Sequence, residues 1–263
     1  MRILVTNDDG IYANGLWHLA RALKEIGQVT IVAPDREQSA VGTSVTLHHP
    51  LRARQIKPLA RGVNCYSVEG TPADSVILAL KVLLSDRVDL VVSGINEGSN
   101  LGNDVLISGT VGAALQGYLQ GIPSIALSVG GLRKVHFDAA TKLAAVIARM
   151  VKTNALPKDT FLNINLPNLP LSQIKGVEIT HLGERSYGDI IEEGHDGKRT
   201  YYWIVRGKPT WEPTEGSDIQ ALINGKISIT PLHVNLTSHS ALPVLEQLST
   251  AIFQELGSHR LRK

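Results

Sequence analysis

The chain opens with Met1-Arg-Ile-Leu-Val-Thr-Asn-Asp-Asp-Gly10, and this stretch decides the fold class. Its apolar run, Ile3–Val5, is short, rich in branched side chains and followed by turn formers, which is typical of a strand buried on both faces of a parallel sheet. Asp8 and Asp9 follow at the carboxyl end of that strand, where open α/β sheets bind ligands. Adjacent carboxylates repel each other, which favours a hard divalent metal, but Asn, Asp and Gly also form ordinary solvated turns. This stretch alone leaves both interpretations open.

The composition indicates a globular protein without a disulfide framework. The chain has 263 residues, 43% of them hydrophobic, enough for one large α/β domain or a domain with an appended lobe. A net charge of +2 gives no reason to expect a nucleic-acid polymer as partner. The one cysteine, Cys65, lies in an alternating run and is expected in the core, which fits a reducing compartment. We see no signal peptide and no apolar stretch long enough to span a bilayer, so we expect a cytoplasmic protein that does not enter a membrane.

Strand-like and helical segments alternate after the acidic turn. Apolar residues recur at helical spacing over 15–26, and the branched run Val29–Ala33 then completes a strand–helix–strand unit. This unit predicts a right-handed crossover and a parallel sheet. A β-rich excursion is expected over 45–68, further strands at 89–95, 125–129 and 161–166, and helices at 71–84, 111–120 and 136–150. Thr71 is expected to cap its helix, with Pro72 at the first helical position.

The character of the sequence changes near residue 167. Strand-like runs at 177–181 and 200–205 are joined by a connection rich in Gly, Glu and Asp, and three of the six tyrosines lie between 187 and 211, with Trp203 and Trp211. We expect a β-hairpin that presents aromatic side chains, either to another subunit or over the sheet edge of its own subunit. A short helix capped by Ser217, a strand at 227–231 and a terminal helix at 240–256 complete the chain.

Four loops meet at one edge of the sheet if these strands are parallel. They are residues 7–10, 34–44, 96–102 and the helix start at 108–110. Their polar side chains are mostly oxygen donors, without a histidine or cysteine cluster: Asp8, Asp9, Ser39, Ser44, Asn96, Asn100 and Asp104. Such a set suits magnesium, manganese or calcium better than zinc. The helix start, Ser108-Gly109-Thr110, presents N–H groups that suit a phosphate, so the sequence predicts phosphoryl chemistry assisted by a cation.

Missing motifs disfavour several enzyme classes. The sequence lacks the Gly-x-Gly-x-x-Gly fingerprint after the first strand, a Gly-x-x-x-x-Gly-Lys-Ser/Thr loop and a Gly-x-Ser-x-Gly elbow, which argues against redox Rossmann enzymes, P-loop NTPases and serine hydrolases. Taken singly, Ser39 reads as a loop hydroxyl and Asn96 as a turn or cap residue. The metal interpretation therefore depends on their convergence with Asp8 and Asp9.

Five motifs, in order along the chain, resemble the SurE (survival protein E) family of metal-dependent nucleotidases. They are Ile3–Gly10, Ala33–Gly42, Gly70–Ser75, Val92–Gly102 and Ser108–Ala113. The match is dense over the first half of the chain and looser through 163–167, 217–218 and 228–231. Ser217-Asp218 stands where the family usually has Thr-Asp, a departure that keeps the hydroxyl.

The resemblance implies a Rossmann-like three-layer α/β/α fold with a mostly parallel sheet and a smaller C-terminal β-rich extension. On this basis we expect a catalytic domain over 1–167. We expect a hairpin and oligomerisation extension with the terminal helix over 168–263, the two forming one continuous SurE-like domain. The family assembles as dimers or tetramers, so self-association is expected here.

The resemblance also implies a site and an activity. One divalent metal per subunit, Mg²⁺ or Mn²⁺, would be held by Asp8, Asp9, Ser39 and Asn96. Phosphate would lie against Asn96, Ser108, Gly109 and Thr110, and Asp8 and Asp9 would be catalytic. The implied enzyme is a 5′-nucleotidase, a phosphoric monoester hydrolase that also accepts nucleoside 3′-monophosphates and short polyphosphate. Attack by metal-bound water and attack by an aspartate both stay open, as does a non-catalytic role in binding metal or nucleotides.

Overall fold

The computed structural model describes residues 1–131 and 134–258, and for 185–190, 206–212 and 257–258 it describes the backbone alone. The chain divides into two compact units, Met1–Leu232 and His233–Lys263. Among the described residues, no helix is long and apolar enough to cross a membrane.

A nine-stranded sheet forms the centre of the first unit, in the order β3-β4-β2-β1-β5-β6-β7-β11-β8. Its six central strands run parallel: β1 (Arg2–Thr6), β2 (Gln28–Pro34), β4 (Asn64–Val68), β5 (Leu90–Glu97), β6 (Ser124–Gly130) and β7 (Phe161–Pro167). At the edges, β3 (Ala53–Gln55) and β11 (Ile227–Pro231) pair antiparallel, and β8 (Val177–Ile179) pairs parallel with β11. The mostly parallel sheet predicted from the sequence is confirmed.

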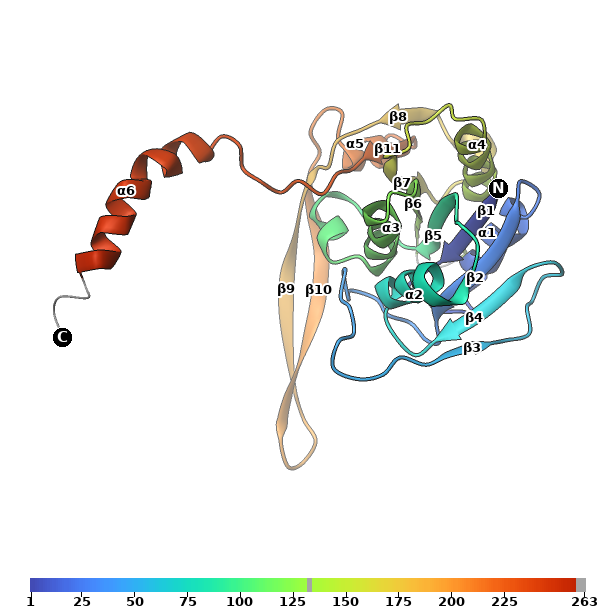
Figure 1. Ribbon diagram of the computed structural model, residues 1–263, viewed down its shortest axis with the longest axis horizontal. Helices are drawn as coiled ribbons and strands as arrows, with labels where there is room; N and C mark the ends of the chain where they lie inside the picture. Colours follow the sequence, from blue (N-terminus) through green and yellow to red (C-terminus); the bar gives the residue numbers. More distant parts are fainter. Residues whose placement is uncertain (132–133, 259–263) are drawn as a thin grey trace. The chain divides into compact units, whose positions relative to one another are not determined.

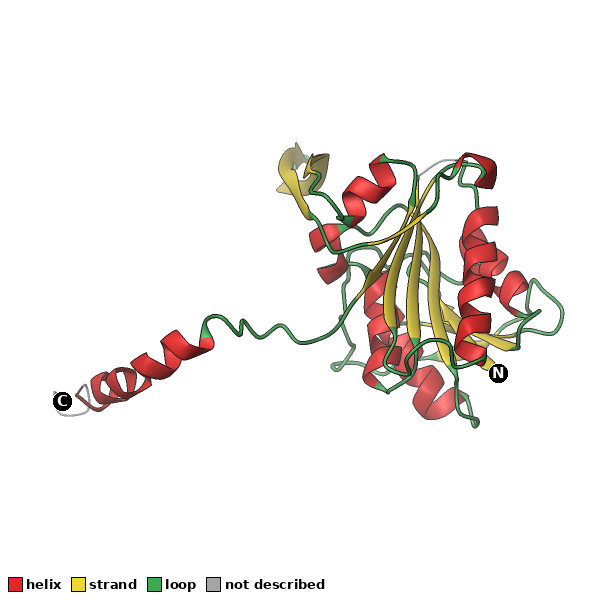
Figure 2. Cartoon of the chain, turned by 90° about the horizontal axis from the view of Figure 1, so that it is seen from above, coloured by secondary structure: helices red, strands yellow, loops and turns green. Residues whose placement is uncertain are grey.

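Helices cover both faces of this sheet (Figures 1 and 2). One face packs against α1 (Asn14–Leu23) and α4 (Asp138–Lys152), and the other against α2 (Pro72–Leu78) and α3 (Gly109–Leu119). A π-helical turn, η1 (Ala79–Leu83), continues α2. Strand β1 is buried from both sides, because Ile3 and Val5 join the core under α1 and α4 while Leu4 joins the core under α2 and α3. The sandwich therefore has three layers, as expected.

The predicted helix caps are present. Thr71 accepts the Asp74 N–H, and the Asp74 carboxylate accepts the Thr71 N–H, which makes a capping box with Pro72 at the first helical position. Ser217 caps α5 (Asp218–Ile223) by accepting the Gln220 N–H at 3.2 Å. These caps are set by local chemistry, so the sequence alone could place them.

The chain after β7 adds strands to the same sheet and forms one separate hairpin. Strands β11 and β8, which follow residue 167, continue the main sheet. The division into domains at residue 167 stays a prediction. The hairpin consists of β9 (Glu184–His195) and β10 (Thr200–Glu212), drawn in Figure 1 as a long two-stranded ribbon. It was predicted, but the Gly-, Glu- and Asp-rich segment expected as a connection is itself β9. Pairing with β10 outweighs the low strand propensity of those residues.

The hairpin and α6 expose large apolar side chains. Tyr201, Tyr202 and Trp203 of β10 are exposed, while the side chains of Tyr187 and Trp211 lie outside the described residues. The terminal helix predicted from the sequence is α6 (Leu242–Ser258). Cys65 is a buried free thiol, as expected.

Candidate active site at the carboxyl ends of β1 and β5

Hydrogen bonds fix the turn that follows β1. The Asn7 side chain donates Nδ2–H to the Gly10 carbonyl at 3.0 Å, and the Gln38 N–H donates to the Asp8 carbonyl at 2.7 Å. Gly10 has φ +95°, and a Cβ there would lie 2.9 Å from the Arg36 carbonyl carbon. Glycine is therefore required, because the loop after β2 packs directly on the turn. Asp8 and Asp9 consequently have fixed positions.

Asp8 is buried against the start of α3. It is 5% exposed, and its Oδ1 accepts the Thr110 Oγ1–H at 2.6 Å. A Cβ on Gly109 would lie 2.8 Å from the Asp8 Cβ, so glycine allows the helix end to approach the carboxylate. Burial raises the pKa of Asp8, and the hydrogen bonds from Thr110 work against that rise. The positive end of the α3 dipole also favours negative charge here.

Asp9 lies among other negative charges that oppose its ionisation. Burial, followed by the negative charges of Asp8, Glu97 and Glu37, raises the pKa of Asp9 to about 7. Its Oδ2 is buried and has no hydrogen-bond partner among the described residues, and the same holds for Asn7 Oδ1. A buried acceptor without a donor is costly. Two desolvated carboxylates with an unpartnered oxygen fit a bound cation, and the hard oxygen donors fit Mg²⁺ or Mn²⁺.

Ser39 lies in the loop after β2, and Asn96 lies at the carboxyl end of β5, which runs two residues further than the strand predicted at 89–95. Ser39 Oγ–H donates to Glu37 Oε1 at 2.8 Å, and Asn96 Nδ2–H donates to the Gly98 carbonyl at 2.7 Å. Glu37 raises the pKa of both aspartates, and the Glu97 backbone N–H faces Asp9, which places both segments beside the pair. The structure thus brings together the segments that carry all four predicted metal ligands, at the carboxyl ends of β1, β2 and β5.

The sequence analysis did not single out Glu37 and Glu97. Both carboxylates act on Asp9 and make the rim more negative than two aspartates alone would. The available signal was their position, since each lies within two residues of a predicted ligand in the same segment. Their charge strengthens the case for a cation.

Three other oxygen-bearing rim residues make hydrogen bonds within or between the segments around the site. The Ser44 carbonyl accepts the Thr71 Oγ1–H at 2.7 Å, which ties the loop after β2 to the start of α2. Asn100 donates its Nδ2–H to Ser128 Oγ at 3.0 Å, which ties the loop after β5 to β6. The Asp104 carbonyl accepts the Ser108 N–H at 3.0 Å just before α3.

The start of α3 is the predicted phosphate site. Ser108 is its N-cap, with Oγ accepting the Val111 N–H at 3.2 Å. The first-turn amides of Gly109 and Thr110 have no partner within the helix by geometry, because the first N–H groups of any helix lack a preceding carbonyl. Since Gly109 packs on Asp8, these amides lie next to the acid pair. Negative charge and anion-binding amides are therefore adjacent.

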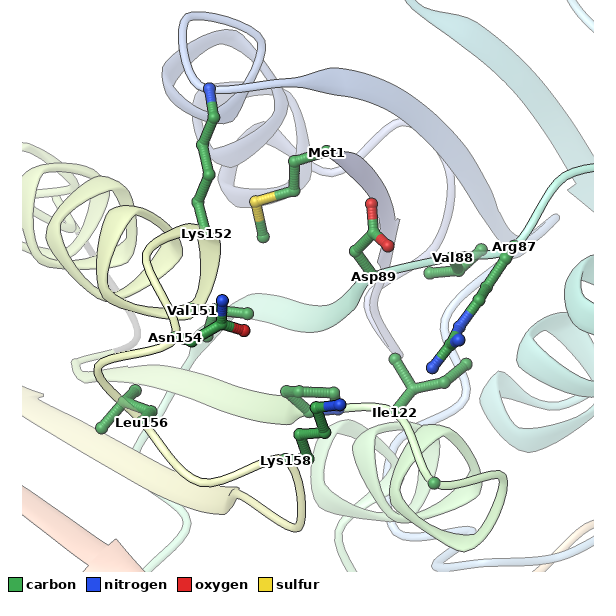
Figure 3. Close-up of a pocket in the computed structure, with 12 residues that line it drawn as sticks. Met1, Arg87, Val88, Asp89, Ile122, Val151, Lys152, Asn154, Leu156 and Lys158 are labelled. Carbon is green, nitrogen blue, oxygen red and sulfur yellow. The ribbon is translucent and has the colours of Figure 1, made fainter.

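Among the residues whose side chains the structure describes, no group of three histidine, cysteine, aspartate or glutamate residues is suited to a metal. The predicted set differs from such a triad, because it has two carboxylates, one hydroxyl and one amide. A cavity of about 310 Å³ lies at the amino ends of the central strands, opposite the candidate site, beside Met1, Asp89 and Lys158 (Figure 3). It contains none of the candidate site residues, and its Asp89 accepts the Arg2 N–H at 2.7 Å.

Comparison with known proteins shows the family of the chain. The family model described as survival protein SurE matches residues 3–189. The chain belongs to the SurE family. A 5′-nucleotidase SurE from Dehalococcoides mccartyi (strain CBDB1) is 52% identical over 238 residues, covering 90% of each chain. One from Geobacter sulfurreducens is 48% identical over 248 residues, covering 94% of this chain and 93% of the relative.

A solved structure supports the fold independently. The crystal structure of a SurE protein from Aquifex aeolicus has a TM-score of 0.80 and 40% identity, covering 95% of this chain and all of that one. The expected SurE-like α/β fold with a hairpin extension is therefore confirmed.

Proposed function

We propose that this protein is a metal-dependent nucleotidase that hydrolyses nucleoside 5′-monophosphates to nucleoside and phosphate. The relatives named 5′-nucleotidase SurE, about half identical over nearly the whole chain, support the reaction class and disfavour a purely non-catalytic role. The observation that carries the location is the acid pair: buried Asp8 is bonded to the start of α3, and half-buried Asp9 has an oxygen without a hydrogen-bond partner among the described residues. Nucleoside 3′-monophosphates and short polyphosphate are further substrates that we expect the same site to accept.

We infer that Asp8, Asp9, Ser39 and Asn96 hold one divalent cation per subunit, Mg²⁺ or Mn²⁺. The raised pKa of Asp9 supports this inference, since a cation would offset the repulsion among Asp8, Asp9, Glu37 and Glu97. When bound, the cation supplies Lewis-acid chemistry: it polarises a phosphate oxygen and lowers the pKa of a coordinated water.

The chain's own residues orient the reacting groups. The Thr110 hydroxyl holds Asp8 Oδ1, which fixes the direction of the second carboxylate oxygen. The Gly109 amide at the start of α3 offers a donor to the negatively charged phosphoryl oxygens, whereas the Thr110 N–H already faces Asp8. Asp8 and Asp9 are the candidate acceptors of a proton from the attacking water.

Direct attack by Asp8 or Asp9 on phosphorus is the alternative route. It would form an aspartyl phosphate, which water then hydrolyses. Acid quenching during turnover with ³²P-labelled substrate distinguishes the routes: a labelled peptide containing residues 8 and 9 would exclude direct water attack.

Substitution of the acid pair tests the location of the site. We expect Asp8→Asn and Asp9→Asn to lower kcat/KM by about 100-fold or more, because both change the charge that the site presents to a cation. The matched control is Asp89→Asn, at the opposite end of β5. Phosphate release is measured over a panel of nucleotides with Mg²⁺ and with Mn²⁺. Full activity of Asp9→Asn in the presence of EDTA would reject the metal site.

We also propose that the chain self-associates through α6. Val244, Leu248, Ile252 and Leu256 recur every four residues and are all exposed by 48–65%. A continuous apolar stripe of this kind marks an interaction surface, and a second copy offers the same stripe in an isologous contact. Light scattering should give a dimer or tetramer for the wild type and a monomer for Leu248→Glu/Ile252→Glu, with Gln247→Glu as the control. A monomeric wild type at micromolar concentration would contradict the proposal.

We also propose that the protein is cytoplasmic. The only cysteine is a free thiol, buried in β4, which fits a reducing compartment. Fractionation of the expressing cells, followed by detection of the native protein, tests it.

A further inference from the structure

The loop after β5, residues 98–102, is held in place at its first residue by the neighbouring strand. Gly98 donates its N–H to the Val129 carbonyl of β6 at 2.9 Å. Gly98 has φ +123° and Gly102 has φ +52°, so both ends of the loop use backbone conformations that favour glycine. We call this segment the 98–102 loop.

Buried amides hold the middle of the 98–102 loop. Asn165 Oδ1 accepts the Asn100 N–H at 2.8 Å, and the Nδ2 groups of Asn163 and Asn165 donate to the Asn100 carbonyl at 2.8 and 3.0 Å. The side chains of Asn163 and Asn165 are fully buried in β7. The backbone of Asn100 is thus satisfied in both directions by rigid strand residues, which fixes its position.

A single buried carboxylate holds the end of the loop. Asp218 is 0% exposed, and its Oδ2 accepts the Gly102 N–H at 2.8 Å. Its Oδ1 accepts the N–H groups of Gly183 and Ile219, both at 2.8 Å. Gly183 immediately precedes β9, so this carboxylate joins the 98–102 loop to the root of the β9–β10 hairpin.

The 98–102 loop is attached to the candidate active site on both sides. On one side, Asn96 donates its side-chain N–H to the Gly98 carbonyl at 2.7 Å. On the other, the 3₁₀ helix η2 (Gly102–Leu106) leads into the start of α3, where Thr110 donates to Asp8. A shift at Gly102 would therefore reach both a candidate metal ligand and the candidate phosphate-binding helix start.

We propose that Asp218 is a positioning residue for the active site, and that its carboxylate couples the root of the β9–β10 hairpin to the loop that places Asn96. The proposal rests on the proposed function for its effect on catalysis, whereas the coupling itself rests only on hydrogen bonds. Three backbone donors share two carboxylate oxygens. An asparagine has one acceptor oxygen, so Asp218→Asn leaves at least one buried N–H facing an NH₂ group.

The test compares Asp218→Asn with Ser217→Ala. Ser217 caps the same helix, so its loss weakens α5 without removing an acceptor from Gly102. In the substrate-free protein, Asp218→Asn should weaken Mn²⁺ binding, measured by calorimetry, by about tenfold, the size seen when groups that orient ligands are removed. It should also speed amide hydrogen exchange in both the 98–102 loop and Gly183. Ser217→Ala should leave the Mn²⁺ affinity and the loop exchange unchanged.

Equal Mn²⁺ affinities for wild type and Asp218→Asn, or faster exchange at Gly183 alone, would overturn the proposal. So would a Ser217→Ala protein with the same loss of Mn²⁺ affinity, because the effect would then belong to α5 as a whole. Since calorimetry and exchange need no turnover, a wild type that binds Mn²⁺ yet hydrolyses no nucleotide would refute the proposed function and leave this test intact.

Gly183→Ala tests the same coupling in a protein that keeps Asp218. Its Cβ would lie 3.2 Å from Asp218 Oδ1 and 2.9 Å from Ile219 Cδ1, so it presses on the carboxylate from the hairpin side. We expect faster amide hydrogen exchange in the 98–102 loop and a raised KM. The four predicted metal ligands are all kept in this variant. This variant decides the matter if Asp218→Asn does not fold: loop exchange identical to the wild type would refute the coupling.

Discussion

Asp9→Asn should make the metal-free protein more stable at pH 8. The pKa of Asp9 rises from 3.8 to about 7 on folding, so ionising it costs the folded protein about 4 kcal/mol relative to the unfolded chain, at 1.36 kcal/mol per pH unit. Asp9 is half-buried, and screening by solvent reduces the expected gain to about 2 kcal/mol. Asparagine keeps the shape and removes the charge.

The gain should depend on pH in a defined window. Below pH 3.8 the carboxyl is protonated in both states, so the two proteins should unfold at similar denaturant concentrations. The wild type loses stability as pH rises from 3.8 towards 7, because the unfolded chain ionises first. Above pH 7 the difference should be constant. The difference in unfolding free energy is measured by urea unfolding in EDTA at pH 4, 6 and 8, at one protein concentration. Asp89→Asn is the control.

A divalent cation should reverse the order of stability. A ligand that binds only the folded state adds about 2.7 kcal/mol at 100 times its dissociation constant, so Mn²⁺ should raise the wild type above Asp9→Asn. An Asp9→Asn protein that is no more stable than the wild type at pH 8 in EDTA would refute the reasoning. A gain that does not change between pH 4 and 8 would refute it equally.

Three further predictions concern the surroundings of the acid pair. Thr110→Val removes the 2.6 Å bond to Asp8 and should lower kcat/KM about tenfold, whereas Thr110→Ser should restore it. Gly109→Ala places a Cβ 2.8 Å from the Asp8 Cβ and should lower activity more than thermal stability, measured side by side. Burial raises the pKa of Cys65 to about 12, so iodoacetamide at pH 8 should label it only after unfolding in urea; rapid labelling of the native protein would contradict its burial.

Local sequence chemistry was sufficient for the main elements of the fold. The run Ile3–Val5 gave a strand buried on both faces, since branched apolar residues without alternation suit only the middle of a sheet. Thr71, Ser108 and Ser217 gave the helix starts, because a cap depends on a hydroxyl and an N–H three residues away. Strand β9 was the exception, because its pairing with β10 is not encoded in its own composition.

The convergence of the site loops could also be predicted, because the carboxyl ends of parallel strands meet at one edge of a sheet. The order of strands and helices along the sequence is therefore enough to place Asp8, Asp9, Ser39 and Asn96 at a common rim. The charges of Glu37 and Glu97 were not singled out, since a glutamate in a loop carries no sign of where its carboxylate will point. Only the fold brings both charges near enough to Asp9 to raise its pKa.

The sequence by itself thus determined the strand, the acid pair at its end and the positions of the helix starts, because each depends on neighbouring residues. Only the tertiary structure decided how the rim is held. Asp218 meets Gly102 across 116 positions of sequence, and Asn165 meets Asn100 across 65. Hydrogen bonds of such separation depend on how distant strands are ordered in the sheet, and no local pattern of residues contains that order.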